Sequence, residues 1–193
     1  MSTLSLKEKK EIREKSAMPL LWLGIVSMVM IFAGLTSAYV VRKGKGDWLQ
    51  FDMPQMFYVS TAIILLSSVT MNWVLASAKK NDLKSIKLAA FITFVLGFAF
   101  IICQFKAWVS LVDQKVFFAG KYSNAAGSYM YMLTVLHLAH LIGGMIALGW
   151  VWIKSMANKY NSENLLGIRL CAIFWHFLDV LWIFLFLFLS LFR

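Results

Sequence analysis

The chain has 193 residues and a formal net charge of +10, and 61% of its residues are hydrophobic while only 15% are charged. A soluble domain of this size is about half apolar, so the composition excludes an ordinary water-soluble enzyme and indicates an integral membrane protein. The basic residues gather in short segments between long apolar runs, where they meet lipid headgroups, and this placement argues against binding to nucleic acid.

A helix needs about 20 apolar residues to cross the hydrocarbon core of a bilayer. Five segments meet this requirement, so the sequence predicts an all-α polytopic membrane protein, a bundle of five transmembrane helices. The expected bounds, in chain order, are 19–41, 54–78, 88–112, 128–153 and 170–192. Residues 1–18 are expected to form a cytoplasmic N-terminal tail, and residues 19–193 to form the membrane domain. Pro19 and Pro54 each open an apolar run, where the missing N–H of proline costs nothing.

The distribution of Lys and Arg predicts the orientation of the chain in the membrane. The N-terminal tail and the second and fourth linkers together carry twelve basic residues, whereas the first and third linkers and the C-terminus carry six. Basic segments stay in the cytoplasm. We therefore expect a cytoplasmic N-terminus and a C-terminus on the opposite side.

Ionisable side chains occur at bilayer depth in the last two apolar segments. His137 and His140 are three positions apart and share one helix face. His176 and Asp179 have the same spacing in the final segment. One hypothesis is a metal or haem site, built from three imidazoles and a carboxylate on facing helices. The other is a buried hydrogen-bonded cluster that holds the fourth and fifth helices together.

The residue pattern favours the structural hypothesis and leaves the metal site open. H-x-x-D is a loose pattern, and the Glu-x-x-His motif of many bundle metal sites is absent from the sequence. With a rise of about 1.5 Å per residue, antiparallel neighbours place His140 and Asp179 near the same depth. We therefore expect Asp179 to pair with an imidazole of the preceding helix. Trp175, Asp179 and Trp182 form one stripe at i, i+4 and i+7.

Three further residues are expected to serve helix packing. Gly143 and Gly144 are adjacent, and paired glycines let another helix or a lipid chain come close. Gln104 is a single amide on an apolar helix, for which an interhelical hydrogen bond is the ordinary role. Lys106 lies near the end of its segment, and its long stem can carry the amine to the headgroups.

The stretch "FWHFLDVLWIFLF", residues 174–186, resembles the last-helix signature of subunit III of the haem–copper oxidases, W-H-F-x-D-x-x-W. The stretch "GSYMYMLTVLHLAHLIGGMIAL", residues 127–148, is similar to the preceding helix of that family, with its H-x-x-H and paired glycines. The order of all five segments agrees over residues 19–192. Larger members of the family have seven helices, and this chain resembles the five-helix form that lacks the first two.

The resemblance implies the non-catalytic subunit III of a proton-pumping terminal oxidase, most simply a cytochrome c oxidase, in a bacterial plasma membrane. Such a subunit carries no catalytic residue and no metal of its own. It packs against subunit I, which holds the haems and copper, and its other expected partners are subunit II, a small subunit IV and phospholipids held in a V-shaped cleft. The residues expected to form a structural polar cluster or to line the cleft are His137, His140, Trp175, His176, Asp179 and Trp182.

Several alternatives stay open at this point. A quinol is the alternative electron donor, and an accessory protein of a nitric oxide reductase is an alternative within the same family. From a different class, a stand-alone membrane metalloprotein would use the histidines of the last two helices. Membership of a respiratory supercomplex is also open. Many relatives carry a buried glutamate after the serine of the first helix, but here Ser27 is followed by Met28, so a role tied to that carboxylate is not expected.

Overall fold

The computed structural model describes residues 6–46, 48, 51–120, 123–156 and 165–192. These residues form helices and connections without any strand. The helices are α1 (Leu6–Lys43), α2 (Gln55–Lys79), α3 (Leu83–Asp113), α4 (Ala125–Met156) and α5 (Leu166–Leu191). Each is long and apolar enough to cross a membrane, so the predicted all-α class and the five spans are confirmed.

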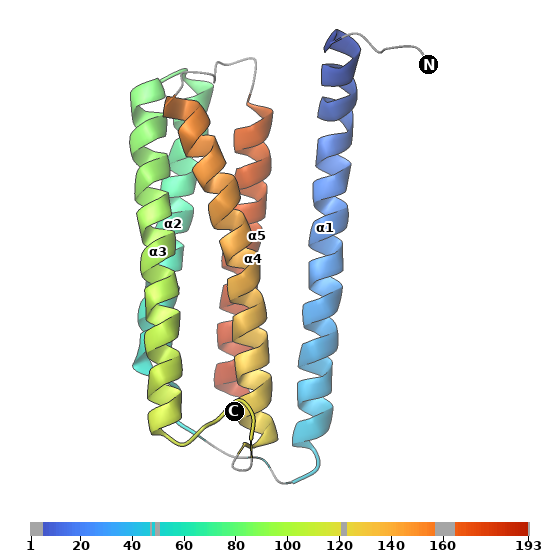
Figure 1. Ribbon diagram of the computed structural model, residues 1–193, viewed down its shortest axis with the longest axis vertical. Coiled ribbons are helices and arrows are strands. Elements are labelled where there is room, and N and C mark those ends of the chain that lie inside the picture. The colour runs from blue at the N-terminus through green and yellow to red at the C-terminus, as the bar shows by residue number, and fades with distance from the viewer. Residues whose placement is uncertain (1–5, 47, 49–50, 121–122, 157–164, 193) are drawn as a thin grey trace.

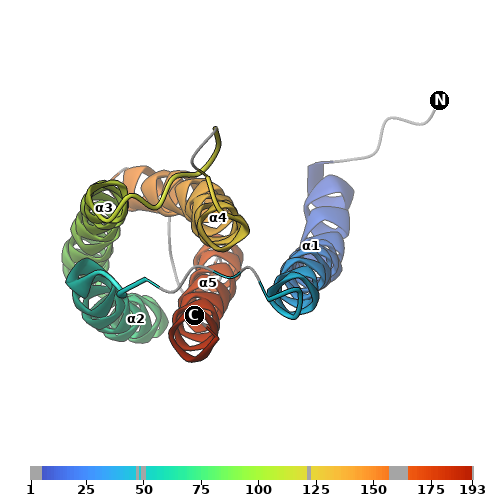
Figure 2. The same ribbon diagram turned by 90° about the horizontal axis from the view of Figure 1, so that it is seen from below.

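The helices run alongside one another with alternating directions. In Figure 1 the beginnings of α1, α3 and α5 lie at one end of the molecule, and the beginnings of α2 and α4 lie at the other. Figure 2, seen along the bundle, shows α2, α3, α4 and α5 arranged in a ring with α1 outside it. Among the described helices, α1 contacts only α4 and α5. The molecule is therefore a four-helix bundle with one peripheral helix.

The first helix starts much earlier than expected. It begins at Leu6, and Pro19 lies inside it rather than at its first turn. Residues 6–18 are rich in Lys, Glu and Arg, which are good helix formers, so the helix continues into the segment expected to be a tail. Its candidate membrane span begins at Lys15. A proline within a membrane helix is tolerated because neighbouring groups satisfy the freed carbonyl.

Trp182 of α5 is the residue around which the four-helix bundle packs. Its fully buried indole contacts a ring from each of the other three helices. The ring centroids lie 5.8 Å from Phe57 of α2, 5.0 Å from Phe100 of α3 and 5.1 Å from His137 of α4. Offset and edge-on aromatic pairs at these separations add to the apolar burial. One side chain therefore ties the interior faces of all four helices together.

At Gly97 the backbone of α3 is met by side chains of α4 and α5. A Cβ atom at this position would overlap the sulfur of Met145 on α4 and would lie 3.0 Å from Cη2 of Trp175 on α5. Small residues at membrane helix contacts allow such close backbone approach. The absence of a side chain at Gly97 therefore leaves room for the Met145 sulfur and the indole of Trp175.

α1 is fastened to α5 at the end of the molecule where both helices finish. The hydroxyl of Tyr39 and the amine of Lys43 both donate to the backbone carbonyl of Phe192, at 3.0 and 2.8 Å. The Tyr39 ring also packs edge-on against Phe188 of α5 and Tyr129 of α4, with centroids 5.1 and 5.9 Å apart. This terminal clamp fixes one end of the peripheral helix.

The connection between α2 and α3 is a tight turn that ends in a helix cap. Asn81 adopts a left-handed conformation with φ 55°, which asparagine tolerates better than most residues. The carboxylate of Asp82 then accepts hydrogen bonds from the backbone N–H groups of Lys84 and Ser85 and from the Ser85 hydroxyl. These hydrogen bonds, that from the Ser85 side chain foremost, lower the pKa of the Asp82 carboxyl.

Replacement of Gly97 by alanine is expected to lower the free energy of unfolding by about 1–3 kcal/mol, because the new methyl group must displace Met145 or Trp175. The matched control is Gly143→Ala, since a Cβ there meets nothing within 4 Å and alanine favours a helix. Thermal unfolding of the purified protein, followed by tryptophan fluorescence, compares the two variants. Equal shifts for both would contradict the close approach at Gly97.

The α3 cap is expected to weaken in acid. Because the folded pKa of Asp82 lies below its unfolded value, the stabilisation by the cap is present above the unfolded pKa and is lost as the pH falls through the folded pKa. Hydrogen exchange at the amides of Lys84 and Ser85, corrected for intrinsic rates, should then lose protection. Asp82→Asn keeps a capping oxygen without titrating, so its protection should not change with pH.

Candidate functional site

One face of α2 carries a line of hydroxyl side chains, the hydroxyl face, made of Ser60, Thr61, Ser67, Ser68 and Thr70. Four of these hydroxyls donate to backbone carbonyls three or four residues earlier in α2, at 2.7–3.0 Å. This bond satisfies the proton of the hydroxyl and leaves lone pairs that can accept a second hydrogen bond. The hydroxyl face is therefore a row of acceptors directed at neighbouring helices.

α5 donates to this face through both tryptophans of its polar stripe. The indole N–H of Trp175 bonds to Oγ of Ser67 at 3.1 Å, and that of Trp182 bonds to Oγ1 of Thr61 at 3.0 Å. The two tryptophans lie two helical turns apart, and because α2 and α5 are antiparallel their acceptors have the reverse order. A buried indole N–H needs such a partner, and these two bonds fix the register between α2 and α5.

His176 and Asp179 extend the same contact. Nδ1 of His176 lies 2.8 Å from Oγ of Ser68 and 3.8 Å from Oδ2 of Asp179. The histidine side chain is partly exposed and the carboxylate is buried. The second distance is beyond hydrogen-bond length, so Ser68 is the direct partner of the imidazole. Within the described residues neither oxygen of Asp179 has a hydrogen-bond partner.

α3 forms hydrogen bonds with Ser60 and Thr70, the other two hydroxyls of the hydroxyl face. The amide nitrogen of Gln104 donates to Oγ of Ser60 at 3.2 Å, and both side chains are buried. The hydroxyls of Thr70 and Thr93 lie 2.8 Å apart, and either can be the donor. The expected interhelical role of Gln104 thus corresponds in the structure to a bond with α2. The hydroxyl face joins α3 on one side and α5 on the other.

The two histidines of α4 lie in different surroundings. His137 is fully buried, and in the described part of the chain neither ring nitrogen has a hydrogen-bond partner. Its ring lies against Trp182 and is 6.0 Å from that of Phe100. His140 points toward α1, where its ring is 5.8 Å from Phe32, and its Nδ1 bonds to the carbonyl of Leu136 in its own helix at 2.8 Å.

This arrangement differs from the expected cluster between the fourth and fifth helices. The expected partner of Asp179 was an imidazole of α4, but its close polar neighbour is His176 of its own helix, which bonds to α2. Nδ1 of His140 bonds to the carbonyl of Leu136 in its own helix instead of to Asp179. Across the described ranges, no three His, Cys, Asp or Glu side chains come together as they would to hold a metal ion. The four residues of the metal hypothesis therefore do not converge.

The adjacent glycines Gly143 and Gly144 lie in different surroundings. A Cβ at Gly144 would lie 3.0 Å from Leu178 and 3.4 Å from Phe174, so this glycine permits close contact with α5. Gly143 is exposed and faces open space.

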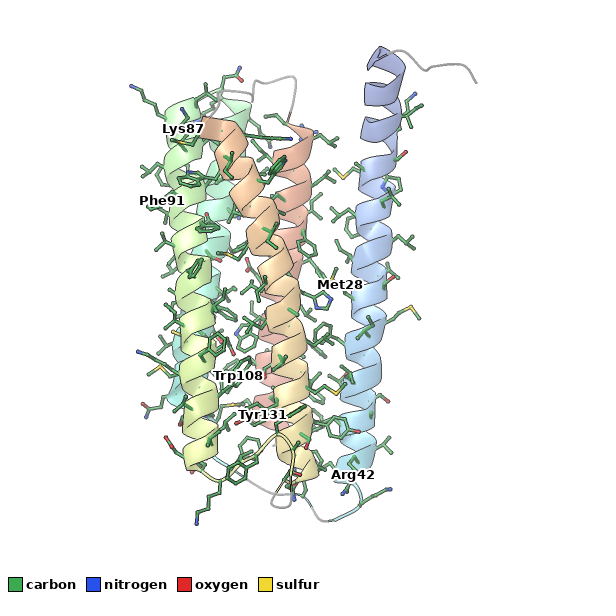
Figure 3. All side chains as sticks on the ribbon, in the orientation of Figure 1. Met28, Arg42, Lys87, Phe91, Trp108 and Tyr131 are labelled. Carbon is green, nitrogen blue, oxygen red and sulfur yellow. The ribbon has the colours of Figure 1, made fainter. Side chains whose placement is uncertain are left out.

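Figure 3 labels Met28 on α1, which is half-buried on the same helix face as Ile25 and Phe32. Met28 thus places a thioether beside the bundle, at the position where the resemblance led us to look for a glutamate.

The sequence analysis did not identify the hydroxyl face as the partner of α5. A signal for it exists, because the five hydroxyls recur at intervals that bring them to one side of a helix. Trp108 and Tyr131, both labelled in Figure 3, were also missed, although they form hydrogen bonds that link α3 and α4. The indole N–H of Trp108 bonds to Thr134 at 3.1 Å, and the Tyr131 hydroxyl bonds to the carbonyls of Trp108 and Val116.

A groove separates α1 from α5 outside the bundle. This α1–α5 groove has a volume of about 570 Å³ and is lined almost entirely by apolar atoms. Its lining residues are Val29, Phe32, Ala33, Thr36, Ser37, Val40, Phe177, Val180, Leu181, Phe184 and Phe188. None of the six residues expected in a polar cluster or lipid cleft lines it. The groove offers apolar contact to an extended hydrocarbon chain.

The family described as cytochrome c oxidase subunit III matches residues 49–193, which include the whole α2–α5 bundle. The chain belongs to the cytochrome c oxidase subunit III family.

Relatives of this subunit III have matching names. A probable cytochrome c oxidase subunit 3 of Nocardia farcinica is 30% identical over 177 residues, covering 86% of this chain and 82% of the relative. Cytochrome c oxidase subunit 3 of Thermostichus vulcanus is 27% identical and covers 84% and 80%. Cytochrome bo(3) ubiquinol oxidase subunit 3 of Buchnera aphidicola is 31% identical and covers 89% of both. The prediction of a haem–copper oxidase subunit III is confirmed.

The bond between Trp175 and Ser67 is expected to couple energetically. In a double-mutant cycle, Trp175→Phe removes the N–H and keeps most of the ring, and Ser67→Ala removes the acceptor. The coupling between the two changes should be about 0.6–1.7 kcal/mol, the range for hydrogen bonds between membrane helices. Unfolding of subunit III with sodium dodecyl sulfate measures it. A cycle with the exposed Trp150→Phe should give no coupling, and a Trp175 cycle without coupling would contradict the register argument.

Proposed function

We propose that this subunit III is the non-catalytic third subunit of a proton-pumping cytochrome c oxidase of the bacterial plasma membrane. In this proposal it packs against subunit I, with subunit II and a small subunit IV as further members of the complex. The complex reduces oxygen to water, and the haems and copper belong to its other subunits. The work of this chain is to stabilise subunit I and to hold phospholipid beside it, so no catalytic residue is assigned to it.

The observation that carries the proposal is the use made of polar groups inside the bundle. Four side chains each form a hydrogen bond with a hydroxyl of α2. They are Trp175, Trp182, Gln104 and His176. Groups engaged in this way hold helices together, whereas a reaction centre needs groups directed at a substrate. The structural role thus accounts for His176, one of the four residues that a stand-alone metalloprotein would need as ligands.

The lipid part of the proposal is supported by the α1–α5 groove. Its lining combines aromatic and branched aliphatic side chains of two helices, and its volume of about 570 Å³ is in the range of ordinary ligand pockets. Because a membrane surrounds the helices, the most abundant molecule of matching chemistry is a phospholipid acyl chain. The clamp at Phe192 holds the end of α1 next to the end of α5.

Two further parts of the proposal depend on the relatives and on charge. The relatives that match include both cytochrome c oxidases and a ubiquinol oxidase, so a quinol is the second candidate donor. The excess of basic residues at the end of the molecule where α1 begins supports an N-terminus in the cytoplasm and a C-terminus in the periplasm.

Purification tests this function most directly. The chain is tagged at its N-terminus and isolated from native membranes in a mild detergent. The co-purifying chains are identified by mass spectrometry, and a reduced-minus-oxidised spectrum is recorded. We expect subunits I and II and oxidase haem bands in stoichiometric amounts. A subunit II with a copper centre identifies cytochrome c as the donor, and one without it identifies a quinol.

Other outcomes of this purification would replace the proposal. Co-purification with nitric oxide reductase subunits would assign the chain to that complex. Isolation of the chain alone with a stoichiometric metal, lost in a His140→Ala variant, would support the metalloprotein alternative. A variant at the exposed Lys106, such as Lys106→Gln, serves as a matched control for handling losses.

A further inference from the structure

Two side chains inside the four-helix bundle carry polar atoms that no other described residue bonds. The amide nitrogen of Gln104 donates to Ser60, but the carbonyl oxygen Oε1 of Gln104 has no partner in the described part of the chain. The same holds for both ring nitrogens of His137. Gln104 is 1% exposed and His137 is 0% exposed. Because unpaired polar atoms are costly at this burial, the two side chains together point to a polar ligand.

Gln104 and His137 lie at nearly the same depth in the bundle. α3 and α4 are antiparallel neighbours, and the hydrogen bond between Trp108 and Thr134 fixes their register. Counting four residues back along α3 and four forward along α4 from this bond places Gln104 opposite Leu138. His137 precedes Leu138, so it is displaced from Gln104 by only about 1.5 Å along the bundle.

Both side chains also face the same interior aromatic contacts. The ring of His137 lies 6.0 Å from Phe100 of α3 and 5.1 Å from Trp182 of α5, centroid to centroid. Phe100 lies four residues before Gln104, so the two share one face of α3. Gln104 is therefore directed into the part of the interior that His137 occupies.

The bond to Ser60 decides which atom of Gln104 remains available. α3 lies between α2 and α4 in the ring of helices (Figure 2), and the amide nitrogen is used on the α2 side. The oxygen and nitrogen of an amide diverge from the same carbon, so Oε1 is directed away from Ser60. An acceptor from α3 and the imidazole of His137 thus remain at one level of the interior.

The chemistry of these atoms identifies the class of ligand. Oε1 only accepts hydrogen bonds, whereas a neutral imidazole has one donor and one acceptor nitrogen. A water molecule donates one proton to Oε1 and meets the imidazole with its other proton or with a lone pair, so either tautomer of His137 is served. A metal ion fits less well, because it takes about four or more ligands and this level offers two.

From these features we infer that the bundle binds a water molecule between Oε1 of Gln104 and a ring nitrogen of His137. Buried waters bond to groups that would otherwise lack partners and are part of the structure that holds them. With the Gln104–Ser60 bond, this water completes a chain of hydrogen bonds from α2 through α3 to α4. Among the described helices α2 and α4 have no direct contact, so the water links them across the interior.

Solid-state nuclear magnetic resonance of the full-length chain in bilayers tests the inference. The chain has three histidines, so labelling histidine with ¹⁵N gives few signals, and a His140→Gln, His176→Gln double variant leaves only that of His137. Magnetisation is transferred from water protons at mixing times too short for proton exchange. We expect transfer to His137 despite its full burial. The reference is Nδ1 of His140, which bonds to the carbonyl of Leu136.

Two variants separate the water from the interhelical bond. Gln104→Met removes both Oε1 and the bond to Ser60 while it keeps the length of the side chain. Ser60→Ala removes the bond alone and leaves Oε1 in place. Since a buried water needs two to four polar partners, transfer to His137 should be lost in Gln104→Met and retained in Ser60→Ala. An unchanged His140 signal reports that the bundle is intact in each variant.

The inference is overturned if the unmodified chain shows no transfer to His137, if transfer survives in Gln104→Met, or if both variants lose it equally. The first measurement needs no change at either residue. A high-resolution map of the intact complex checks the position, with density expected about 2.7–3.2 Å from both atoms. A direct contact between Gln104 and His137 would also overturn it. Every group involved belongs to this chain, so the result is independent of the proposed oxidase partners.

Discussion

Hydrogen bonding to α2 is the constraint on which the rest of the structure depends. Inside hydrocarbon no water is present to satisfy a polar side chain, so a polar group without a partner on its own or another helix is costly. α2 provides the partners for the indoles of Trp175 and Trp182 and for the amide of Gln104. These bonds fix α5 and α3 on either side of α2. The aromatic contacts of Trp182 and the close approach at Gly97 follow from that register.

The sequence predicted the number, order and approximate position of the helices, because hydropathy depends on composition alone. It predicted the face of α5 that carries His176 and Asp179 for a similar reason, since spacing fixes the direction of a side chain about its own helix axis. Spacing does not say which helix lies opposite that face. The expected neighbour was α4, and the polar contact is with α2 because Ser68 is the hydroxyl within reach. The first span was expected to begin at residue 19, whereas α1 begins at Leu6, because hydropathy does not detect a charged segment that continues a helix.

α1 is attached to the bundle in a different way from the other helices. Among the described helices it contacts only α4 and α5, and one end is held by the hydrogen bonds of Tyr39 and Lys43 to the carbonyl of Phe192. Two lipid-sized spaces lie along its contact with α4 and α5. The peripheral helix of this subunit III therefore leaves open space beside its contacts with α4 and α5.

The back-bonding of the α2 hydroxyls also has a consequence for biogenesis. During synthesis α2 leaves the translocon before α5 exists, so its polar side chains must enter lipid without their final partners. Ser60, Thr61 and Ser67 already donate to carbonyls of their own helix, and this bond needs no second helix. α2 can therefore remain in the bilayer before its hydroxyls bond to a second helix. α5, which carries the indole donors, is synthesised last. The hydroxyl acceptors of α2 are then already in the membrane, so the acceptors precede the donors in the order of synthesis.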